Sequence, residues 1–256
     1  MDDEKEQKLE NIMKESRLFS DLKREGSKVT ADGKETLKIA KGGQGTVYRA
    51  HSGIIRRDVA IKVPHKKLDF EEGIGEYSYF KEFGNVPLGS ALQSIEYASP
   101  DGAVIAEYQT GGALSSLSKK DPERAKEICL DPKKLSRLFN SIRALNEKGW
   151  VHRDIKEDNI FLDKNNDFVL GDFGVAQNEL TNKRDGTAPI GTLGYIPPEL
   201  LKLGDNSEKD LRKQDVFAMG ITLFQVHANT DMYELLGVSQ QASIFHIIFR
   251  YGEEPG

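Results

Sequence analysis

The chain has 256 residues and a mass of 28.6 kDa, which is enough for one large domain or two small ones. Its composition, 38% hydrophobic and 30% charged, predicts a buried core and excludes disorder or a fibrous repeat for most of the chain. The 36 basic and 41 acidic residues give a net charge of -5, so we expect no nucleic-acid partner. The single cysteine, Cys129, can form neither an internal disulfide nor a structural zinc site alone.

Neither a membrane span nor a secretion signal is predicted. The longest uncharged run near the end of the chain, residues 216–230, is too short to cross a bilayer. The first ten residues, MDDEKEQKLE, lack the apolar core of a signal peptide. We therefore expect a soluble protein of the cytoplasm or another intracellular compartment, and a secreted bacterial effector acting inside a host cell stays open as an alternative.

Residues 1–35 form a charged N-terminal extension for which we predict helical structure. Its apolar residues recur at roughly helical spacing, namely at Leu9, Ile12, Met13, Phe19 and Leu22. Two interpretations follow from this pattern. The stripe packs on the body of the protein, or it docks a regulatory partner.

From Leu37 the pattern changes to short runs rich in Val, Ile and Tyr, which predict strands. Residues 92–98 and 103–108 flank a Ser-Pro-Asp-Gly turn and predict a hairpin, and one helix is expected at residues 71–83. After Gly112 the pattern is mainly helical, as in residues 133–148, whose helix should end at Gly149. We predict an α+β fold of two lobes, a β-rich lobe at residues 36–108 and a larger helical lobe at residues 109–256.

Two features of the β-rich lobe suggest phosphate binding. Residues 40–47, Ala-Lys-Gly-Gly-Gln-Gly-Thr-Val, lie between two predicted strands, and glycines let backbone N–H groups approach phosphate oxygens. A plain glycine-rich hairpin turn explains the same residues. Lys62 stands alone in an apolar strand, where its ammonium must reach either solvent or an anion.

The strongest motif lies within the helical lobe. Residues 151–159 read Val-His-Arg-Asp-Ile-Lys-Glu-Asp-Asn, and Asp-Phe-Gly follows at residues 172–174. In this order, with the glycine-rich loop and Lys62, they resemble the eukaryotic-type protein kinases from about residue 37 to at least residue 226. Residues 107–114 resemble the family's hinge, residues 191–199 the end of its activation segment, and residues 213–220 the start of its central helix.

The resemblance implies a Ser/Thr protein kinase that uses ATP and Mg²⁺, or Mn²⁺ in its place, to phosphorylate a protein substrate. Asp154 would orient the attacking hydroxyl, Lys156 would stabilise the γ-phosphate, and Asn159 and Asp172 would hold the metal. Lys62 would contact the phosphates and pair with a helix carboxylate. Glu76 is favoured for that pairing over Glu71, Glu72 and Glu82, because Phe80 and Phe83 follow it at positions +4 and +7 on one predicted inward face. The nucleotide-binding residues implied are Ala40, Lys41, Gly42, Gly43, Gln44, Gly45, Val47, Ala60, Lys62, Ala106, Glu107, Tyr108 and Phe161.

Regulation is expected at the activation segment. Arg153 precedes the catalytic Asp, and a phosphate on Thr181 or Thr187 could pair with it and order the loop. An alternative is that both threonines are ordinary loop hydroxyls. Thr192 is better assigned to the active-site network, and with Lys156 it favours Ser/Thr specificity over Tyr.

The sequence departs from the family pattern in three places. Ala40 replaces the first loop glycine. Ala106 lies where the family has a larger residue at the back of the nucleotide pocket, so we expect bulky N6-substituted ATP analogues to enter. Only 41 residues follow Asp215, so the C-terminal lobe is expected to be shortened, whether naturally or by truncation, and Glu199 to lack its usual Arg partner. Such a lobe resembles the compact kinases that some bacterial pathogens inject into host cells, and a regulatory partner could bind to it instead of to the N-terminal extension. A pseudokinase that binds nucleotide or partners without transfer, and a small-molecule kinase, are the competing functions.

Overall fold

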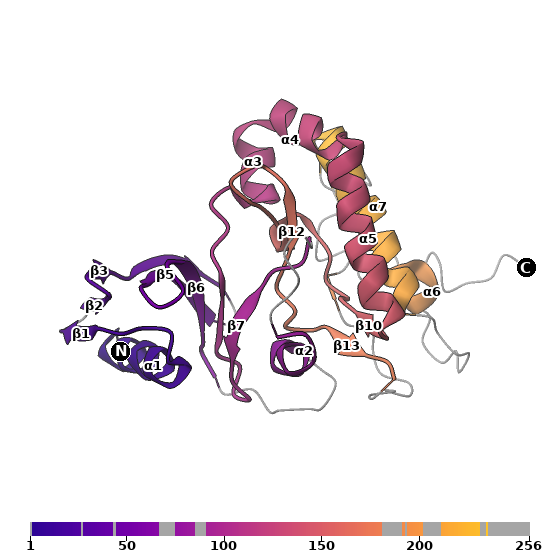
Figure 1. Ribbon diagram of the computed structural model, residues 1–256. Helices are drawn as coiled ribbons and strands as arrows, with labels where there is room; N and C mark the ends of the chain where they lie inside the picture. Colours follow the sequence, from indigo (N-terminus) through magenta and orange to yellow (C-terminus); the bar gives the residue numbers. More distant parts are fainter. Residues whose placement is uncertain are drawn as a thin grey trace, which may run out of the picture. The chain divides into compact units, whose positions relative to one another are not determined.

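The computed structural model describes residues 2–26, 28–42, 45–66, 75–84, 91–180, 191–192, 194–201, 211–230 and 234. The chain divides into two compact units. The first contains residues 1–72, 76–88 and 93–108, and the second contains residues 73–75, 89–92 and 109–256. The first is rich in antiparallel strands and the second is mainly helical, so the fold class is α+β as predicted (Figure 1).

The first unit is built on a five-stranded antiparallel sheet with the strand order β4-β5-β6-β8-β7. Its strands are β4 (Leu37–Lys41), β5 (Gly45–Ser52), β6 (Arg57–Pro64), β7 (Ile95–Ala98) and β8 (Val104–Glu107). These strands lie in the runs rich in Val, Ile and Tyr that predicted strands, and β7 and β8 form the expected hairpin. The helix α2 (Gly75–Phe83) completes this unit.

Alternation along β6 separates the two faces of this sheet. Val59, Ile61 and Val63 are buried in an apolar cluster on one face. Because successive side chains of a strand point to opposite faces, Ala60 and Lys62 project from the other face. The register with β8 pairs Ala60 with Ala106. The sheet therefore presents Lys62 on one side and a packed core on the other.

The N-terminal segment covers the apolar face of the sheet. The helix α1 (Asp2–Ser16) lies beside β6 (Figure 1). It buries Leu9, Ile12 and Met13 in the same cluster as Ile61, and Lys8 Nζ donates to the carbonyl of Pro64 at 2.7 Å. The apolar stripe thus packs on the chain's own sheet.

The prediction of a helical extension through residue 35 is wrong beyond Ser16. A three-stranded antiparallel sheet follows, made of β1 (Leu22–Glu25), β2 (Lys28–Ala31) and β3 (Lys34–Glu35). Its strands alternate, with Val29 and Ala31 buried between more exposed neighbours. The many charged residues of this segment occupy positions that either a strand or a helix would expose to solvent. The period of two was therefore not recognisable in the sequence.

The second unit combines helices with three small strand pairings. Its elements are β9 (Gly112–Ala113), α3 (Leu114–Lys120), α4 (Pro122–Cys129), α5 (Pro132–Glu147), β10 (Trp150–Val151), η1 (Glu157–Asn159), β11 (Ile160–Leu162), β12 (Phe168–Leu170), β13 (Gln177–Asn178), α6 (Pro198–Leu201) and α7 (Arg212–Ala228). One apolar core joins the helices α3, α4, α5 and α7 to the hairpin β11–β12. The helix predicted at residues 133–148 is α5, and Gly149 follows it with a φ of 83°.

Two negative findings belong with the fold. Within the described ranges, no helix is both long enough and apolar enough to cross a membrane. Cys129 is buried at the end of α4, and burial raises the pKa of its thiol to about 12. A thiol with so high a pKa is not a nucleophile near neutral pH.

Candidate active site

In the first unit, Lys62 forms an ion pair with Glu76. Lys62 Nζ lies 3.3 and 3.1 Å from Glu76 Oε1 and Oε2, so both carboxylate oxygens contact the ammonium. The Lys62 side chain is 19% exposed and the Glu76 side chain 9%. Among the other carboxylates considered, Glu82 is exposed, and Glu71 and Glu72 lie outside the described residues.

The inward face of α2 differs from the predicted one. Glu76, Ser78 and Tyr79 are its buried residues, whereas Phe80 and Phe83 are only half-buried. The ring of Tyr79 packs on that of Phe83 at a centroid distance of 4.7 Å, and burial raises the pKa of the Tyr79 hydroxyl. Glu76 and Tyr79, three positions apart, therefore lie on the inward face, and the carboxylate of Glu76 rather than a phenyl ring contacts Lys62.

The glycine-rich turn joins β4 to β5. Gly42 N donates to Gly45 O at 2.9 Å, and the pairing shifts register between Lys38 and Ala40. A Cβ on Gly45 would lie 2.7 Å from the carbonyl oxygen of Val63, so this position requires glycine. Lys41 and Val47 flank the turn on the paired strands, and Gly43 and Gln44 lie outside the described residues.

The end of β8 carries the residues expected near the adenine. Ala106 is buried, with 6% of its surface exposed. Glu107 Oε1 forms an ion pair with Arg57 Nη1 at 3.2 Å, and Tyr108 N donates to Asp58 O at 3.2 Å. The ring of Tyr108 lies under the guanidinium of Arg49 at 4.6 Å. These contacts hold the last residues of the first unit in place.

In the second unit, Asp154 is the centre of a dense network of hydrogen bonds. Its Oδ1 accepts from Thr192 N at 3.1 Å and from Thr192 Oγ1 at 2.6 Å. Its Oδ2 lies 2.9 Å from Lys156 Nζ and 3.0 Å from Asn159 Nδ2. Lys156 Nζ also donates to Thr192 Oγ1 at 2.8 Å. The structure therefore brings Asp154, Lys156, Asn159 and Thr192 together as one constellation.

The loop that carries Asp154 is anchored on α7. Asp215, fully buried in the first turn of that helix, accepts from His152 N and Arg153 N, each at 2.9 Å, and from Asn146 Nδ2 at 3.3 Å. Burial raises the pKa of Asp215, while His152 and these N–H donors act in the opposite direction. A single buried carboxylate thus positions the backbone on which Asp154 stands.

His152 links this loop to the segment that contains Asp172. Its Nδ1 accepts from Asp154 N at 3.3 Å, so Nε2 carries the proton that is donated to Gly171 O at 3.0 Å. The His152 ring packs against Phe173 at a centroid distance of 4.9 Å. Arg153 and Asp172 have positive φ angles of 66° and 60°, a strained conformation that is concentrated at functional sites.

The donor set fits a magnesium ion. Asn159 uses its amide nitrogen for both bonds to Asp154, and neither bond uses its amide oxygen. Asp172 supplies a carboxylate, and Mg²⁺ in phosphoryl-transfer sites takes one or two protein oxygens besides phosphate and water. Among the residues that the structure describes, no group of three His, Cys, Asp or Glu side chains forms a metal site.

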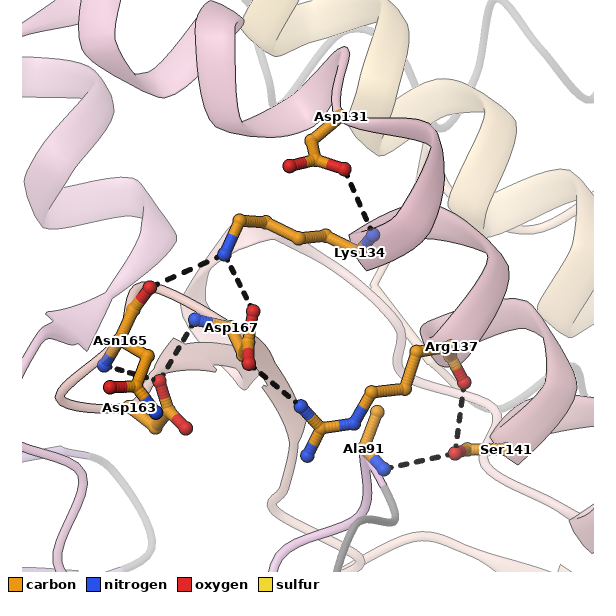
Figure 2. A network of polar contacts seen from close by, with 8 residues as sticks. All are labelled: Ala91, Asp131, Lys134, Arg137, Ser141, Asp163, Asn165 and Asp167. Carbon is orange, nitrogen blue, oxygen red and sulfur yellow. Dashed lines mark hydrogen bonds and ion pairs between the residues drawn. The ribbon is translucent and has the colours of Figure 1, made fainter.

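Phe161 lies on β11, between two paired strands. It is half-buried and pairs with Val169 of β12 and Ala113 of β9. Figure 2 shows how the hairpin loop is held: Lys134 and Arg137 of α5 both point to Asp167, at 2.5 and 3.0 Å. The hairpin between Asn159 and Asp172 is therefore fixed to the helical core, and its two ends keep a defined spacing.

Sequence reasoning missed two residues of this site. Asp215 lies in residues 213–220, which resemble the start of the family's central helix, but its carboxylate was given no role. A lone Asp in the first turn of an apolar helix is a signal that could have identified it. Gln177 accepts a hydrogen bond from Arg153, and no local pattern indicates this. Of the predicted regulatory residues, Arg153 is buried, Thr192 contacts Asp154, and Thr181 and Thr187 lie outside the described residues.

The protein kinase domain family matches residues 34–251, and the chain belongs to this family. Most of the N-terminal segment described above, including α1, precedes the match. The order of the glycine-rich turn, Lys62, the Asp154 loop and Asp172 agrees with this assignment.

Several curated relatives are similar. A putative L-type lectin-domain containing receptor kinase I.4 of Arabidopsis thaliana is 28% identical over 204 residues, which are 77% of this chain and 29% of the relative. A probable LRR receptor-like serine/threonine-protein kinase of the same plant is 33% identical over 75% of this chain and 32% of the relative. Citron Rho-interacting kinase of Mus musculus is 29% identical over 65% of this chain and 8% of its own length. The chain thus spans less than a third of the length of these relatives.

Proposed function

We propose that this chain transfers the γ-phosphate of ATP to Ser or Thr hydroxyls of protein substrates. The observation that carries the proposal is the network around Asp154, in which both carboxylate oxygens are held by Thr192, Lys156 and Asn159. A carboxylate fixed in this way can accept a hydrogen bond from an incoming hydroxyl in one orientation, which is what an in-line displacement requires.

Each residue has a distinct task in this reaction. Asp154 orients the acceptor hydroxyl and receives its proton. Lys156, already bound to Asp154 and Thr192, lies beside the reacting groups and offsets the negative charge that develops there. Lys62, held by Glu76, binds phosphate oxygens. Asn159 and Asp172 would hold Mg²⁺, or Mn²⁺ in its place, which neutralises phosphate charge when bound.

Specificity for Ser and Thr is supported by Lys156 and Thr192, whose side chains bond to each other across 36 positions of sequence. We also propose that the chain phosphorylates itself in the activation segment, with Thr181 and Thr187 as the acceptors. The names of the relatives, which include serine/threonine-protein kinases, agree with this specificity. A regulatory partner, if one exists, would use exposed surface, because the apolar residues of α1 are buried.

The nucleotide pocket is proposed to have extra room beside Ala106. Ala106 carries only a methyl group, and its cross-strand neighbours in β6 and β7 are Ala60 and Ile95. N6-benzyl-ATP should therefore bind the wild type at least about tenfold more tightly than an Ala106→Met variant, a difference of about 1.4 kcal/mol. Equal affinities would contradict the proposal of an open pocket.

The experiment that tests the function uses radiolabelled ATP, Mg²⁺ and generic acceptor proteins, with phosphoamino-acid analysis of the product. Transfer to Ser or Thr that is abolished in Asp154→Asn and Asp172→Asn is the expected result. ATP binding without any transfer would favour a pseudokinase, the second function open to this fold. Phosphotyrosine as the main product would contradict the Ser/Thr specificity.

A further inference from the structure

Both backbone polar groups of Arg153 are hydrogen-bonded to side chains of α7. Its N–H donates to Asp215 Oδ1 at 2.9 Å, and its carbonyl accepts from Gln214 Nε2 at 3.0 Å. A Cβ on Gly191 would lie 2.4 Å from that carbonyl oxygen, so the chain packs closely there as well. The direction in which the Arg153 side chain leaves the loop is therefore determined by α7 and residue 191.

The guanidinium of Arg153 is bonded to the segment that follows Asp172. Its Nε donates to Val175 O at 2.7 Å, and its Nη1 donates to Gln177 Oε1 at 2.5 Å. Arg153 is 5% exposed and Gln177 is 2% exposed. Gln177 lies in β13, where it pairs with Val151 of β10, two residues before Arg153. Two strands and one buried side-chain bond thus tie the catalytic loop to the start of the activation segment.

These bonds change what Arg153 can do. A guanidinium is always charged in proteins, so its burial is tolerated only where oxygen acceptors satisfy its N–H groups. Val175 O and Gln177 Oε1 satisfy two of these N–H groups with neutral oxygens from this chain. A phosphate group on the activation segment would have to displace or rearrange these bonds to pair with Arg153.

We propose that Gln177 is a positioning residue that holds Arg153, and through it the Asp154 loop, in the active arrangement, so that transfer does not depend on phosphorylation of Thr181 or Thr187. The proposal rests on the proposed kinase function and concerns the regulation of the same site. Autophosphorylation then becomes a product of activity and not its condition. An unmodified glutamine thus supplies the oxygen acceptor for Arg153 that was expected from a phosphorylated threonine.

The test compares dephosphorylated and phosphorylated protein. The full chain is treated with a protein phosphatase, intact mass confirms that no phosphate remains, and initial rates are measured with a generic protein acceptor. The treated wild type and the double variant Thr181→Ala/Thr187→Ala should keep kcat within about twofold of the autophosphorylated wild type. A loss of more than about tenfold on phosphatase treatment, restored by autophosphorylation, would overturn the proposal.

Variants of Gln177 test the positioning role itself. Gln177→Ala should lower kcat about tenfold and leave the KM for ATP within about twofold, because the change acts on Asp154 and not on Lys62. Gln177→Glu keeps an oxygen acceptor and should retain most of the activity even if the alanine variant folds poorly. The matched control is Gln225→Ala, which removes another buried glutamine that accepts a hydrogen bond, from Tyr195.

The outcomes separate this inference from the proposed function. If Gln177→Ala has the kcat of Gln225→Ala, or if Gln177→Glu loses as much as Gln177→Ala, Gln177 does not position the loop. If neither treated nor untreated wild type transfers phosphate although ATP binds, the kinase function itself fails. Activity of the phosphorylated form alone leaves the function standing and removes only the independence from phosphate.

Discussion

The two charged centres of this kinase domain are held by different means. The pair Lys62–Glu76 joins one strand to one short helix by an ion pair whose side chains are 19% and 9% exposed. Asp154 is bonded to three other side chains, and its loop is anchored again on the buried Asp215. Asp154 is therefore held by several groups at once.

This difference indicates where adjustment is expected. The Lys62–Glu76 ion pair keeps some solvent exposure, so we expect breaking it to cost less stability than breaking the Asp154 network. A fully hydrogen-bonded network in the interior is rigid, and breaking it leaves buried groups without partners. We therefore expect changes at Asp154 and Asp215 to be costly, and changes at Glu76 to affect activity more than stability.

The largest effect is expected for Asp154→Asn. The amide cannot accept the proton of the acceptor hydroxyl, so kcat should fall about 10²–10⁴-fold. The midpoint of thermal unfolding should also fall, because the amide nitrogen cannot accept the hydrogen bonds that one carboxylate oxygen accepts. Initial rates with radiolabelled ATP measure the first effect and calorimetry the second. Asp158→Asn, an exposed carboxylate in the same loop, is the control, and an equal loss there would refute the role of Asp154.

Asp215→Asn tests the anchor below the catalytic loop. The amide leaves at least one of the N–H groups of His152 and Arg153 without an acceptor, so the free energy of unfolding should fall by about 2–4 kcal/mol. Denaturant unfolding measures this loss. Asp158→Asn again serves as the matched control, with an expected change within about 0.5 kcal/mol. A stable Asp215→Asn protein would mean that the loop is held by other contacts.

Lys62→Met and Glu76→Gln break the weaker centre. We expect kcat/KM to fall about 10²–10³-fold for Lys62→Met and about tenfold for Glu76→Gln, because the lysine contacts phosphate and the glutamate only orients it. In a double-mutant cycle the two losses should not add. Glu82→Gln, an exposed carboxylate on the same helix, is the control. Additive losses would mean that Glu76 does not act through Lys62.

The smallest effect concerns Asp32, which fastens the N-terminal segment. Its Oδ1 accepts from Ser20 Oγ at 2.5 Å, and its Oδ2 accepts from Gly53 N at 2.6 Å. Partial burial acts to raise the pKa of Asp32, but hydrogen bonds from Ser20, Gly53 and Asp21 together lower it.

The sign of the pH dependence follows from that lowered pKa. Stability from Asp32 is present above the unfolded pKa of about 3.9 and is lost as pH falls through the lower folded pKa. Asp32→Asn should therefore cost about 1 kcal/mol near pH 7 and less near pH 2, as thermal unfolding at both pH values would measure. Asp21→Asn should show a smaller change, and a cost for Asp32→Asn that grows toward low pH would contradict the sign.

Local patterns predicted most of the elements. The strands of the five-stranded sheet follow from short runs rich in Val, Ile and Tyr between turns, and the helix α5 follows from a period of 3.6 that reflects one buried face. The short sheet β1–β3 was missed because its outward positions carry the same charged residues that a helix would expose. The inward face of α2 was misplaced because ring hydrophobicity was weighted above the ion pair.

By itself, the sequence determined the family and the order of the motifs, and it named Lys62, Glu76, Asp154, Asn159 and Asp172 as candidates, because these lie in short, recognisable segments. Only the tertiary structure decided that Asp215 anchors the loop, that Gln177 occupies Arg153 and that α1 covers the sheet behind Lys62. Those contacts join residues 24 to 63 positions apart. Local sequence patterns cannot predict these contacts, because they depend on which buried polar groups the folded chain brings within hydrogen-bonding distance.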